Sequence, residues 1–163
     1  MENLIRFRGN PDQCRKLLKE TRITTEAPGT ILRDVEVLLD AIGTKGIATK
    51  SKNGNLPTDY LAQLNERMSD PIEIELKRPL LRNYPNLAGV FLLLRTMDLV
   101  VIRGRRTCVD SSQLKRWRSL GPAERYFALL ETWLAHADPR LLDQGADNPM
   151  IANNLLEFML FLG

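Results

Sequence analysis

The side chains best suited to chemistry in this chain are arginines clustered at one turn. Arg103, Arg105 and Arg106 surround Gly104, and residues 100–109 contain the strand-forming residues and the central glycine of a β-hairpin. Guanidinium groups present planar sets of N–H donors that match phosphate oxygens, so this turn suits a contact with a nucleic-acid backbone or minor groove. Arginine also keeps exposed hairpin ends soluble, and the sequence leaves this second explanation open.

Further basic side chains precede and follow the turn. Those that would extend the same contact are Arg78, Arg82, Arg95, Lys115, Arg116 and Arg118. Residues 77–118 contain 10 basic and 2 acidic side chains, a net charge of +8, whereas residues 1–76 have a net charge of −1 and residues 119–163 of −4. A polyanion would be attracted to the basic middle of the chain. We therefore predict these six residues and the three arginines of the turn as the nucleic-acid-binding set, with an ordinary solvated surface as the alternative.

Residues able to carry catalysis or hold a metal are few. His136 is the one histidine, and Cys14 and Cys108 are the two cysteines, which does not match the ligand spacing of a zinc site. We expect both cysteines to be reduced and Cys108 to be a small core residue of the hairpin. Ser111 and Ser112 begin a predicted helix and are expected to cap it rather than act as nucleophiles. The sequence therefore predicts a protein that is not an enzyme and has no cofactor, metal or catalytic residue.

The length of the chain limits its organisation. Its 163 residues predict one domain with one hydrophobic core, made of a compact part over about residues 30–120 and a helical extension over residues 121–163. The longest apolar runs, residues 90–94 and 158–162, are far shorter than the roughly 20 residues that cross a bilayer. The first residues lack the apolar centre of a secretory signal, which favours a cytoplasmic location without membrane contact.

Apolar spacing and capping residues predict a mainly helical chain with a small β-hairpin. Helices are expected over residues 11–21, 31–42, 57–68, 85–98 and 111–120, from residue 122, from residue 139 and over residues 150–162. A short strand is expected at residues 47–50, and residues 72–77 alternate as in a half-buried strand or an extended segment. Asp110 and Gln113 have the spacing of an N-terminal cap for the helix over residues 111–120. Because the last helix ends on an apolar run, we expect it either to dock on the core or to lead into a longer protein.

Three of these helices are assigned specific faces. The apolar stripe of the helix over residues 57–68 comprises Tyr60, Leu61, Leu64 and Met68. The helix over residues 85–98 is apolar nearly all round, and its predicted solvent face comprises Ala88, Leu92, Arg95 and Thr96. The helix from residue 122 has a broad apolar face comprising Tyr126, Phe127, Leu130, Trp133 and Leu134. The helical spacing of Trp117, Tyr126 and Trp133 favours core packing over a platform for base stacking.

The order helix, strand, helix, helix, hairpin over residues 31–109 resembles the winged-helix fold. More narrowly, residues 53–57, residues 77–79, residues 99–100 and the helices carrying Trp117 and Trp133 resemble a leading region of proteins of the Ri-plasmid third-open-reading-frame family. That resemblance spans roughly residues 30–135. It implies a winged-helix-like core with extra N- and C-terminal helices, association with plasmids or mobile elements, and a chain that continues into a longer protein.

Two functions remain in competition at the level of sequence. The first is a winged-helix-like module that binds double-stranded DNA mainly through phosphates, with the arginine turn as its wing. The second is a protein-interaction or dimerisation domain that uses the apolar C-terminal helix. It is favoured because 16 residues lie between the helix ending at Met68 and the helix beginning at Pro85, far more than the 3–4 residues of a helix-turn-helix. Only Arg95 of the third helix is suited to contacting bases.

Overall fold

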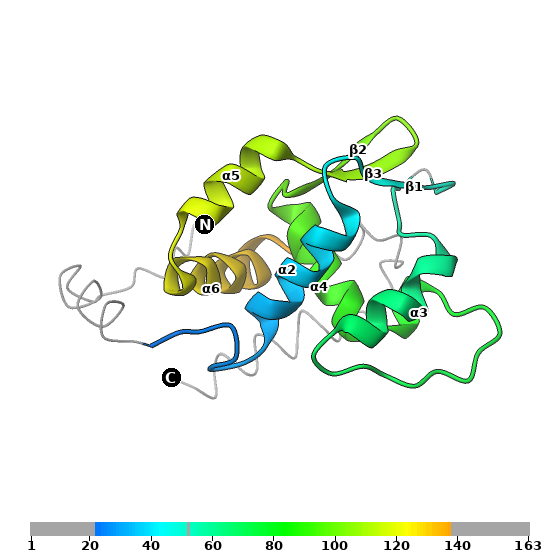
Figure 1. The fold of residues 1–163 in the computed structure, drawn as a ribbon, viewed down its shortest axis with the longest axis horizontal. Helices are drawn as coiled ribbons and strands as arrows, with labels where there is room; N and C mark the ends of the chain where they lie inside the picture. Colours follow the sequence, from blue (N-terminus) through cyan, green and yellow to red (C-terminus); the bar gives the residue numbers. More distant parts are fainter. Residues whose placement is uncertain (1–21, 52, 138–163) are drawn as a thin grey trace, which may run out of the picture.

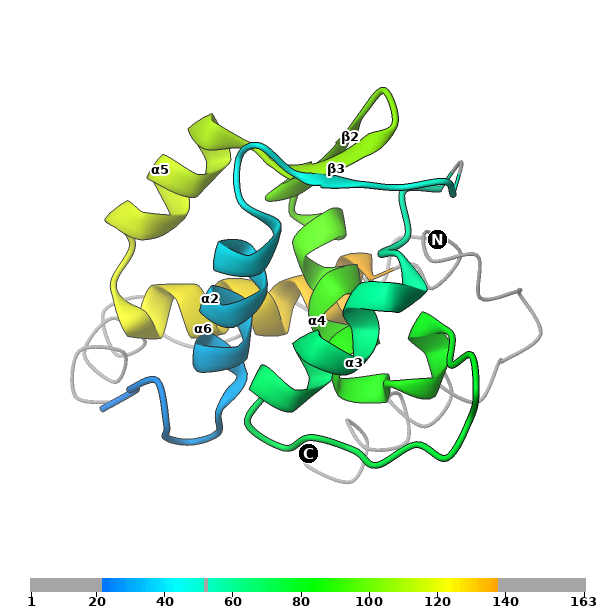
Figure 2. The same cartoon turned by 45° about the vertical axis from the view of Figure 1, so that its right-hand side comes forward.

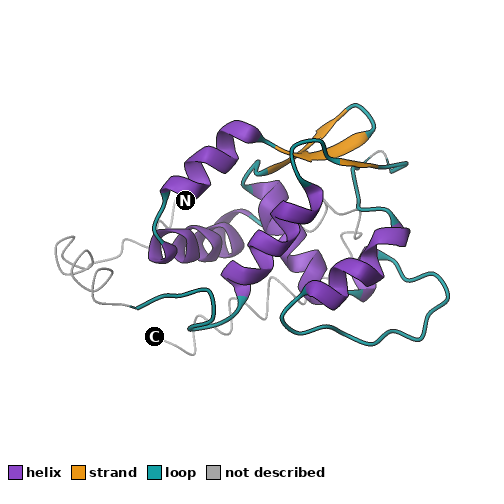
Figure 3. Ribbon diagram, in the orientation of Figure 1, coloured by secondary structure: helices purple, strands orange, loops and turns teal. Residues whose placement is uncertain are grey.

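The computed structural model describes residues 22–51 and 53–137. In these ranges the chain is mainly helical with a β-hairpin, as the sequence predicts, and β1 joins this hairpin in a small three-stranded antiparallel sheet (Figures 1 and 3). The elements in chain order are α2 (Ile31–Ile42), β1 (Ile47–Ala48), α3 (Thr58–Arg67), the 3₁₀ turn η1 (Leu81–Asn83), α4 (Pro85–Thr96), β2 (Val100–Arg103), β3 (Arg106–Val109), α5 (Ser111–Ser119), α6 (Pro122–Glu131) and the π-helical turn η2 (Thr132–His136). The helices predicted over residues 11–21, from residue 139 and over residues 150–162 lie outside the described residues, as does Cys14.

The sheet lies across one end of the helices (Figure 2). Its strand order is β1-β3-β2, and both pairings are antiparallel. In the hairpin Val100 pairs with Val109 and Ile102 with Thr107, across the turn that the sequence predicts at Gly104. The strands are joined by a two-residue turn whose first residue, Gly104, has φ +61°, a backbone conformation that glycine adopts without steric penalty.

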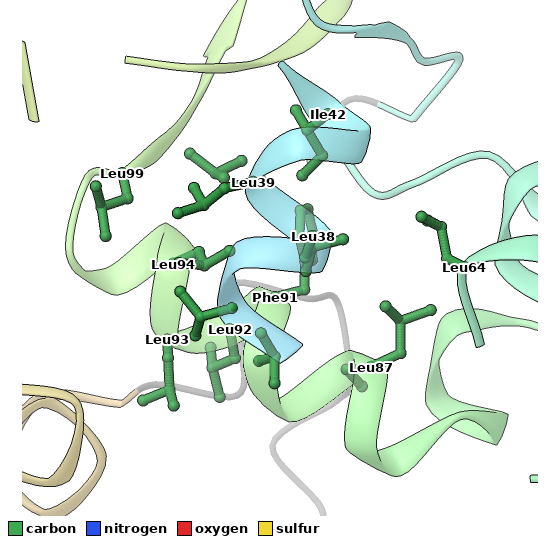
Figure 4. Packing of buried hydrophobic residues seen from close by; sticks show 14 of the residues in the cluster. Leu38, Leu39, Ile42, Leu64, Leu87, Phe91, Leu92, Leu93, Leu94 and Leu99 are labelled. Carbon is green, nitrogen blue, oxygen red and sulfur yellow. The ribbon is translucent and has the colours of Figure 1, made fainter. Parts of the chain in front are cut away.

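Helices α2 and α4 form the centre of the hydrophobic core. Leu38 of α2 and Phe91 of α4 are both fully buried and belong to the same cluster of hydrophobic side chains (Figure 4). Apolar residues recur along α2 at helical spacing, as predicted, and the helix ends at Gly43, which has a positive φ. The carboxylate of Asp34, also on α2, accepts hydrogen bonds from the backbone N–H and hydroxyl of Ser69, each at 2.8 Å, and so joins the end of α3 to α2.

The predicted solvent face of α4 is wrong for two of its four residues. Ala88 and Leu92 are buried, with 6% and 5% of their surface exposed, while Arg95 and Thr96 are half-buried. The physical reason is that α4 contacts α2, η1, β2 and η2, so neighbours cover it on nearly every side. A helix enclosed in this way has no long polar face to place in a DNA groove.

Two other predicted apolar faces are only partly buried. On α3, Leu61, Leu64 and Met68 belong to the core, whereas 45% of the surface of Tyr60 is exposed. On α6 and η2, Leu129 is buried, Tyr126 and Trp133 are half-buried, and Phe127, Leu130 and Leu134 are exposed. Residues 72–77 form an extended segment without strand pairing, with Ile72 and Ile74 half-buried.

Helix α5 is held at both ends. The carboxylate of Asp110 accepts hydrogen bonds from the backbone N–H groups of Ser112 and Gln113, which confirms the predicted cap; the acceptor is Asp110 rather than either serine. Toward the other end, the indole N–H of buried Trp117 donates to Glu36 of α2 at 3.0 Å. None of the helices in residues 22–51 and 53–137 is long and apolar enough to cross a membrane.

Candidate nucleic-acid interface

The three arginines of the hairpin turn have different surroundings. Arg103 donates to Asp110 at 2.6 Å, and Arg106 donates to the backbone carbonyls of Lys45, at 2.8 Å, and of Gly46. The side chain of Arg105 is exposed and makes no hydrogen bond or ion pair within the described part of the chain. Arg105 is therefore the arginine of the turn that is free to meet a ligand.

The pair between Arg103 and Asp110 is a weak constraint on Arg103. The pKa of Asp110 lies below its ordinary value chiefly because the Ser112 hydroxyl donates to the carboxylate, then because of the Gln113 backbone N–H, with the charge of Arg103 a smaller cause. More than half of the Arg103 side chain is exposed, and exposed ion pairs contribute little to stability. Arg103 can exchange Asp110 for a phosphate at small cost, whereas Arg106 serves the fold by joining the hairpin to the segment before β1.

The remaining predicted binding residues also divide into those held by contacts within the protein and those that are exposed without an ion pair. Arg118 pairs with Asp40 at 3.3 Å and Glu36 at 3.8 Å, so it joins α5 to α2. Arg95 is half-buried, donates to the backbone carbonyl of Asn53 at 2.8 Å and lies over the ring of Phe91. Burial lowers the pKa of Arg95, and the nearby charge of Asp98 partly opposes this effect. The exposed members without an ion pair among the described residues are Arg78, Arg82, Lys115 and Arg116.

Tertiary structure places two of the predicted residues around one hollow. A groove of about 850 Å³ lies between the hairpin turn, the segment after β1, the start of α3 and η1. Three exposed cations from three separate segments line this groove: Lys50, Arg82 and Arg105. Its other lining residues are Ala48, Thr49, Ser51, Asn55, Leu56, Pro57, Thr58, Asp59, Tyr60, Leu80 and Leu81. We call it the cationic groove.

Hydrogen bonds between distant segments hold the walls of the cationic groove in place. The backbone N–H of Thr49 donates to the carbonyl of Arg105 at 2.9 Å, which continues the pairing of β1 with β3 up to the turn. The Thr49 hydroxyl donates to the carbonyl of Asn55 at 2.7 Å, and the Thr107 hydroxyl donates to the carbonyl of Gly54. Arg95 fixes the same loop through Asn53. A ligand would therefore meet a preformed groove rather than a loop that must first be ordered.

The electrostatics of the cationic groove favour an anion. Among the described residues that line it, three basic side chains outnumber the single carboxylate, Asp59, and their charges sum to +2. The first residues of α3 also line the groove, and Pro57 supplies no side-chain cap to the amides of that turn. Unpaired amides at a helix N-terminus carry partial positive charge, which explains the presence of Asp59 there and adds to the attraction for a phosphate.

Two lining residues, Lys50 and Tyr60, were missed by the sequence prediction. Lys50 belongs to the first 76 residues, whose charges sum to −1, so counting charge along the chain does not single it out. Tyr60 falls on the helical stripe of Leu61 and Leu64, and spacing alone assigns it to the core. A prediction that the strand at 47–48 pairs with residues 106–107 would have identified Lys50, because that pairing brings Lys50 to the hairpin turn.

A second groove, of about 610 Å³ and lined mostly by apolar side chains, lies beside α6. Val90 and Leu93 of α4 line it together with Tyr126 and Leu130 of α6 and Trp133 of η2. Next to it Phe127, Leu130 and Leu134 are exposed on one stretch of helix, which we call the α6 face. The described residues of this surface include no basic side chain, which distinguishes it in chemistry from the cationic groove.

No group of three or more His, Cys, Asp or Glu side chains is arranged to hold a metal ion in the described ranges. His136 is exposed at the end of η2, and Cys108 is a buried, free thiol of β3. Comparison of the chain with protein-family models, with curated proteins and with solved structures finds no match.

Proposed function

We propose that this protein is a non-enzymatic, winged-helix-like module that binds nucleic acid through its phosphates, and that the cationic groove is the contact. The observation that carries the proposal is the convergence of Lys50, Arg82 and Arg105, which are exposed and have no ion pair among the described residues. A phosphate backbone is the ligand that a row of such cations suits best.

The winged-helix part of this proposal is supported by the order of elements. Helix α2, strand β1, helices α3 and α4 and the β2–β3 hairpin follow one another as in that fold, with β1 beside β3 in the sheet. The proposed relation to the Ri-plasmid third-open-reading-frame family draws on the same stretch of chain. Burial of α4 argues against major-groove reading by this helix, so the proposal assigns binding to the hairpin turn and its neighbours.

The test is fluorescence anisotropy with labelled single-stranded and duplex oligonucleotides at about 50 mM and about 200 mM salt. The test variant combines Lys50→Ala, Arg82→Ala and Arg105→Ala. Because each phosphate contact contributes about 0.7–0.9 to the dependence of log affinity on log salt, we expect the variant to lower that slope by about 2–3. Affinity at the lower salt concentration should fall at least tenfold.

A matched variant removes the same charge elsewhere. Arg33, Arg67 and Lys77 are exposed, lack ion pairs among the described residues and do not line the cationic groove. Replacing these three residues by alanine also removes one lysine and two arginines. We expect it to keep the salt slope within about 1 of the unmodified protein. Equal losses in the two variants, or no binding at low salt, would refute the proposal.

The second candidate function is a protein-interaction module that pairs with another copy of this chain. The observation favouring it is the α6 face, where Phe127, Leu130 and Leu134 recur at helical spacing and are exposed. The C-terminal helix to which the sequence assigned this role lies outside the described residues. Light scattering during gel filtration distinguishes the two: a dimer that Leu130→Asp converts to a monomer supports pairing, and a monomer at all concentrations contradicts it.

A further inference from the structure

We infer that the nucleic acid held in the cationic groove is single-stranded, with a base stacked on Tyr60. This inference rests on the proposed function and adds the class of ligand. Tyr60 lines the groove with 45% of its surface exposed, and beside it Leu80 is 44% exposed. The hydroxyl of Tyr60 makes no hydrogen bond within the described part of the chain, so no such bond fixes the orientation of the ring.

The combination of cationic and aromatic side chains in the groove favours a single nucleic-acid strand over a duplex. Duplex DNA presents phosphates on its outside and keeps the faces of its bases stacked, so arginines on a convex hairpin turn suffice to contact it. A single strand offers both phosphates and unstacked bases, and it is bound where aromatic rings accompany a cationic groove. Tyr60 lies among Lys50, Arg82 and Arg105 in this way, in a hollow rather than on a ridge.

The apolar floor of the groove supports the same ligand. Leu56 and Leu81 are buried beneath it and Pro57 is half-buried, so a base lying on Tyr60 would meet apolar atoms below and cations at the rim. The volume of about 850 Å³ is within the range of pockets that enclose drug-sized molecules, which is the size of one or two nucleotides. Stacking does not distinguish bases strongly, and the inferred binding tolerates different sequences.

The remaining groups that face the groove are compatible with a base. Asp59 is the one carboxylate among the described residues of the groove, and it accepts but does not donate hydrogen bonds when ionised. Base amino groups are donors, whereas phosphates are repelled by a carboxylate. In the inferred complex Lys50, Arg82 and Arg105 contact the backbone, and Tyr60 and Asp59 contact a base.

The experiment compares two ligands that differ only in their bases. A labelled single strand of about 12 nucleotides is measured beside an abasic strand of the same length, which keeps the sugars and phosphates. Tyr60→Ala should weaken binding of the base-containing strand about tenfold, the lower part of the range found when stacking aromatics are replaced. Binding of the abasic strand should not change, and the salt slope should stay the same because no phosphate contact is lost.

Two variants control for the ring and for general damage. Tyr60→Phe keeps the stacking surface and should bind within about twofold of the unmodified protein. Phe127→Ala removes an aromatic that is 38% exposed on the α6 face, away from the groove, and should leave the affinity unchanged. Because Tyr60 is exposed, Tyr60→Ala should keep its thermal unfolding midpoint, which confirms that any lost affinity is local.

Failure of this inference and failure of the proposed function give different results. If Tyr60→Ala binds the single strand normally, or if the abasic strand binds as tightly as the base-containing one, stacking is refuted. The charge-removing variant of Lys50, Arg82 and Arg105 would still lose affinity in that case, and phosphate binding would stand. If the charge-removing variant binds normally, phosphate binding in the groove is refuted and the inference falls with it. Tighter binding of a duplex than of the single strand also overturns the inference.

Discussion

Gly46 lies just before β1, and β3 passes directly against its backbone. A Cβ atom at this position would lie 2.6 Å from the carbonyl oxygen of Thr107 and would collide with the Sγ atom of Cys108. Its φ of +71° is a conformation that residues with a side chain rarely adopt. This close approach lets Arg106 reach the carbonyls of Lys45 and Gly46, so one residue determines how tightly the hairpin is joined to α2.

We predict that Gly46→Ala destabilises the protein by about 3 kcal/mol, because it adds the penalty of a left-handed backbone to that of overpacking. Gly104→Ala meets no atom within 4 Å but has φ +61°, and should cost only about 1 kcal/mol. Gly29→Ala has neither problem and should change the free energy of unfolding by less than about 0.5 kcal/mol. Urea unfolding of the three variants measures these changes in the free energy of unfolding. A loss at Gly46 no greater than at Gly104 would show that the hairpin can move away.

One side chain of α6, Arg125, contacts the C-terminal end of helix α5. Arg125 donates to the carbonyls of Trp117, Leu120 and Arg118, each at 3.0 Å, and these groups lie at the end of α5, where a helix leaves its carbonyls unpaired. Its guanidinium also lies over the Trp117 ring and 3.3 Å from Glu36 of α2. Arg125 thus connects α2, α5 and α6, and α5 carries the exposed cations of residues 115–116 in a defined position.

We predict that Arg125→Met destabilises the protein by about 2–3 kcal/mol, since it leaves several carbonyls without a charged donor and leaves Arg118, at 3.8 Å, as the remaining ion-pair partner of Glu36 among the described residues. Arg125→Lys keeps the charge but lacks the planar fork, and should recover less than half of that loss. Thermal and urea unfolding provide the values, and tryptophan fluorescence reports on the surroundings of Trp117. Arg116→Met is the matched control on exposed surface of α5 and should stay within about 0.5 kcal/mol. Similar losses for Arg125→Met and Arg116→Met would contradict this role.

The whole molecule is organised around the contact between α2 and α4. Fully buried side chains of both helices meet there, and the sheet, α3, α5 and α6 are arranged around this pair (Figures 2 and 4). The burial of α4 has a consequence for function. The helix that a winged-helix protein would place in DNA is here in the centre of the core, so the proposed function assigns binding to side chains around α4.

We predict that Phe91→Ala costs about 4 kcal/mol, because it removes a fully buried ring from a close-packed interior. A loss of this size is a large part of the 5–15 kcal/mol that ordinarily separates folded from unfolded domains. Phe127→Ala removes the same side chain from the exposed α6 face and should cost less than about 1 kcal/mol. Circular dichroism during thermal unfolding checks both. Equal effects of the two substitutions would mean that the core is centred elsewhere.

Several local features of this protein were determined by its sequence alone. The apolar spacing located α2, α3, α4, α5 and α6 to within a few residues, and Gly104 with its flanking strand residues specified the hairpin and its pairing. The Asp110 cap was also predicted correctly, and the strand predicted at residues 47–50 is present at Ile47–Ala48. These features depend on residues close together in the chain, where backbone geometry connects residue type directly to conformation.

Only the tertiary structure decided which of these surfaces are covered and which side chains meet. Periodicity marks the apolar side of a helix but not how many neighbours pack on it. The sequence therefore placed Leu92 on a solvent face and Tyr60 on an apolar stripe, whereas Leu92 is buried and Tyr60 is exposed. Of the predicted cations, Arg106 and Arg118 bind distant parts of the chain, whereas Arg82 and Arg105 join Lys50 around one groove. Those three residues are separated by tens of positions and become neighbours only through the pairing of β1 with β3 and the placement of η1. Local spacing carries no information about such contacts, because they depend on how whole elements pack.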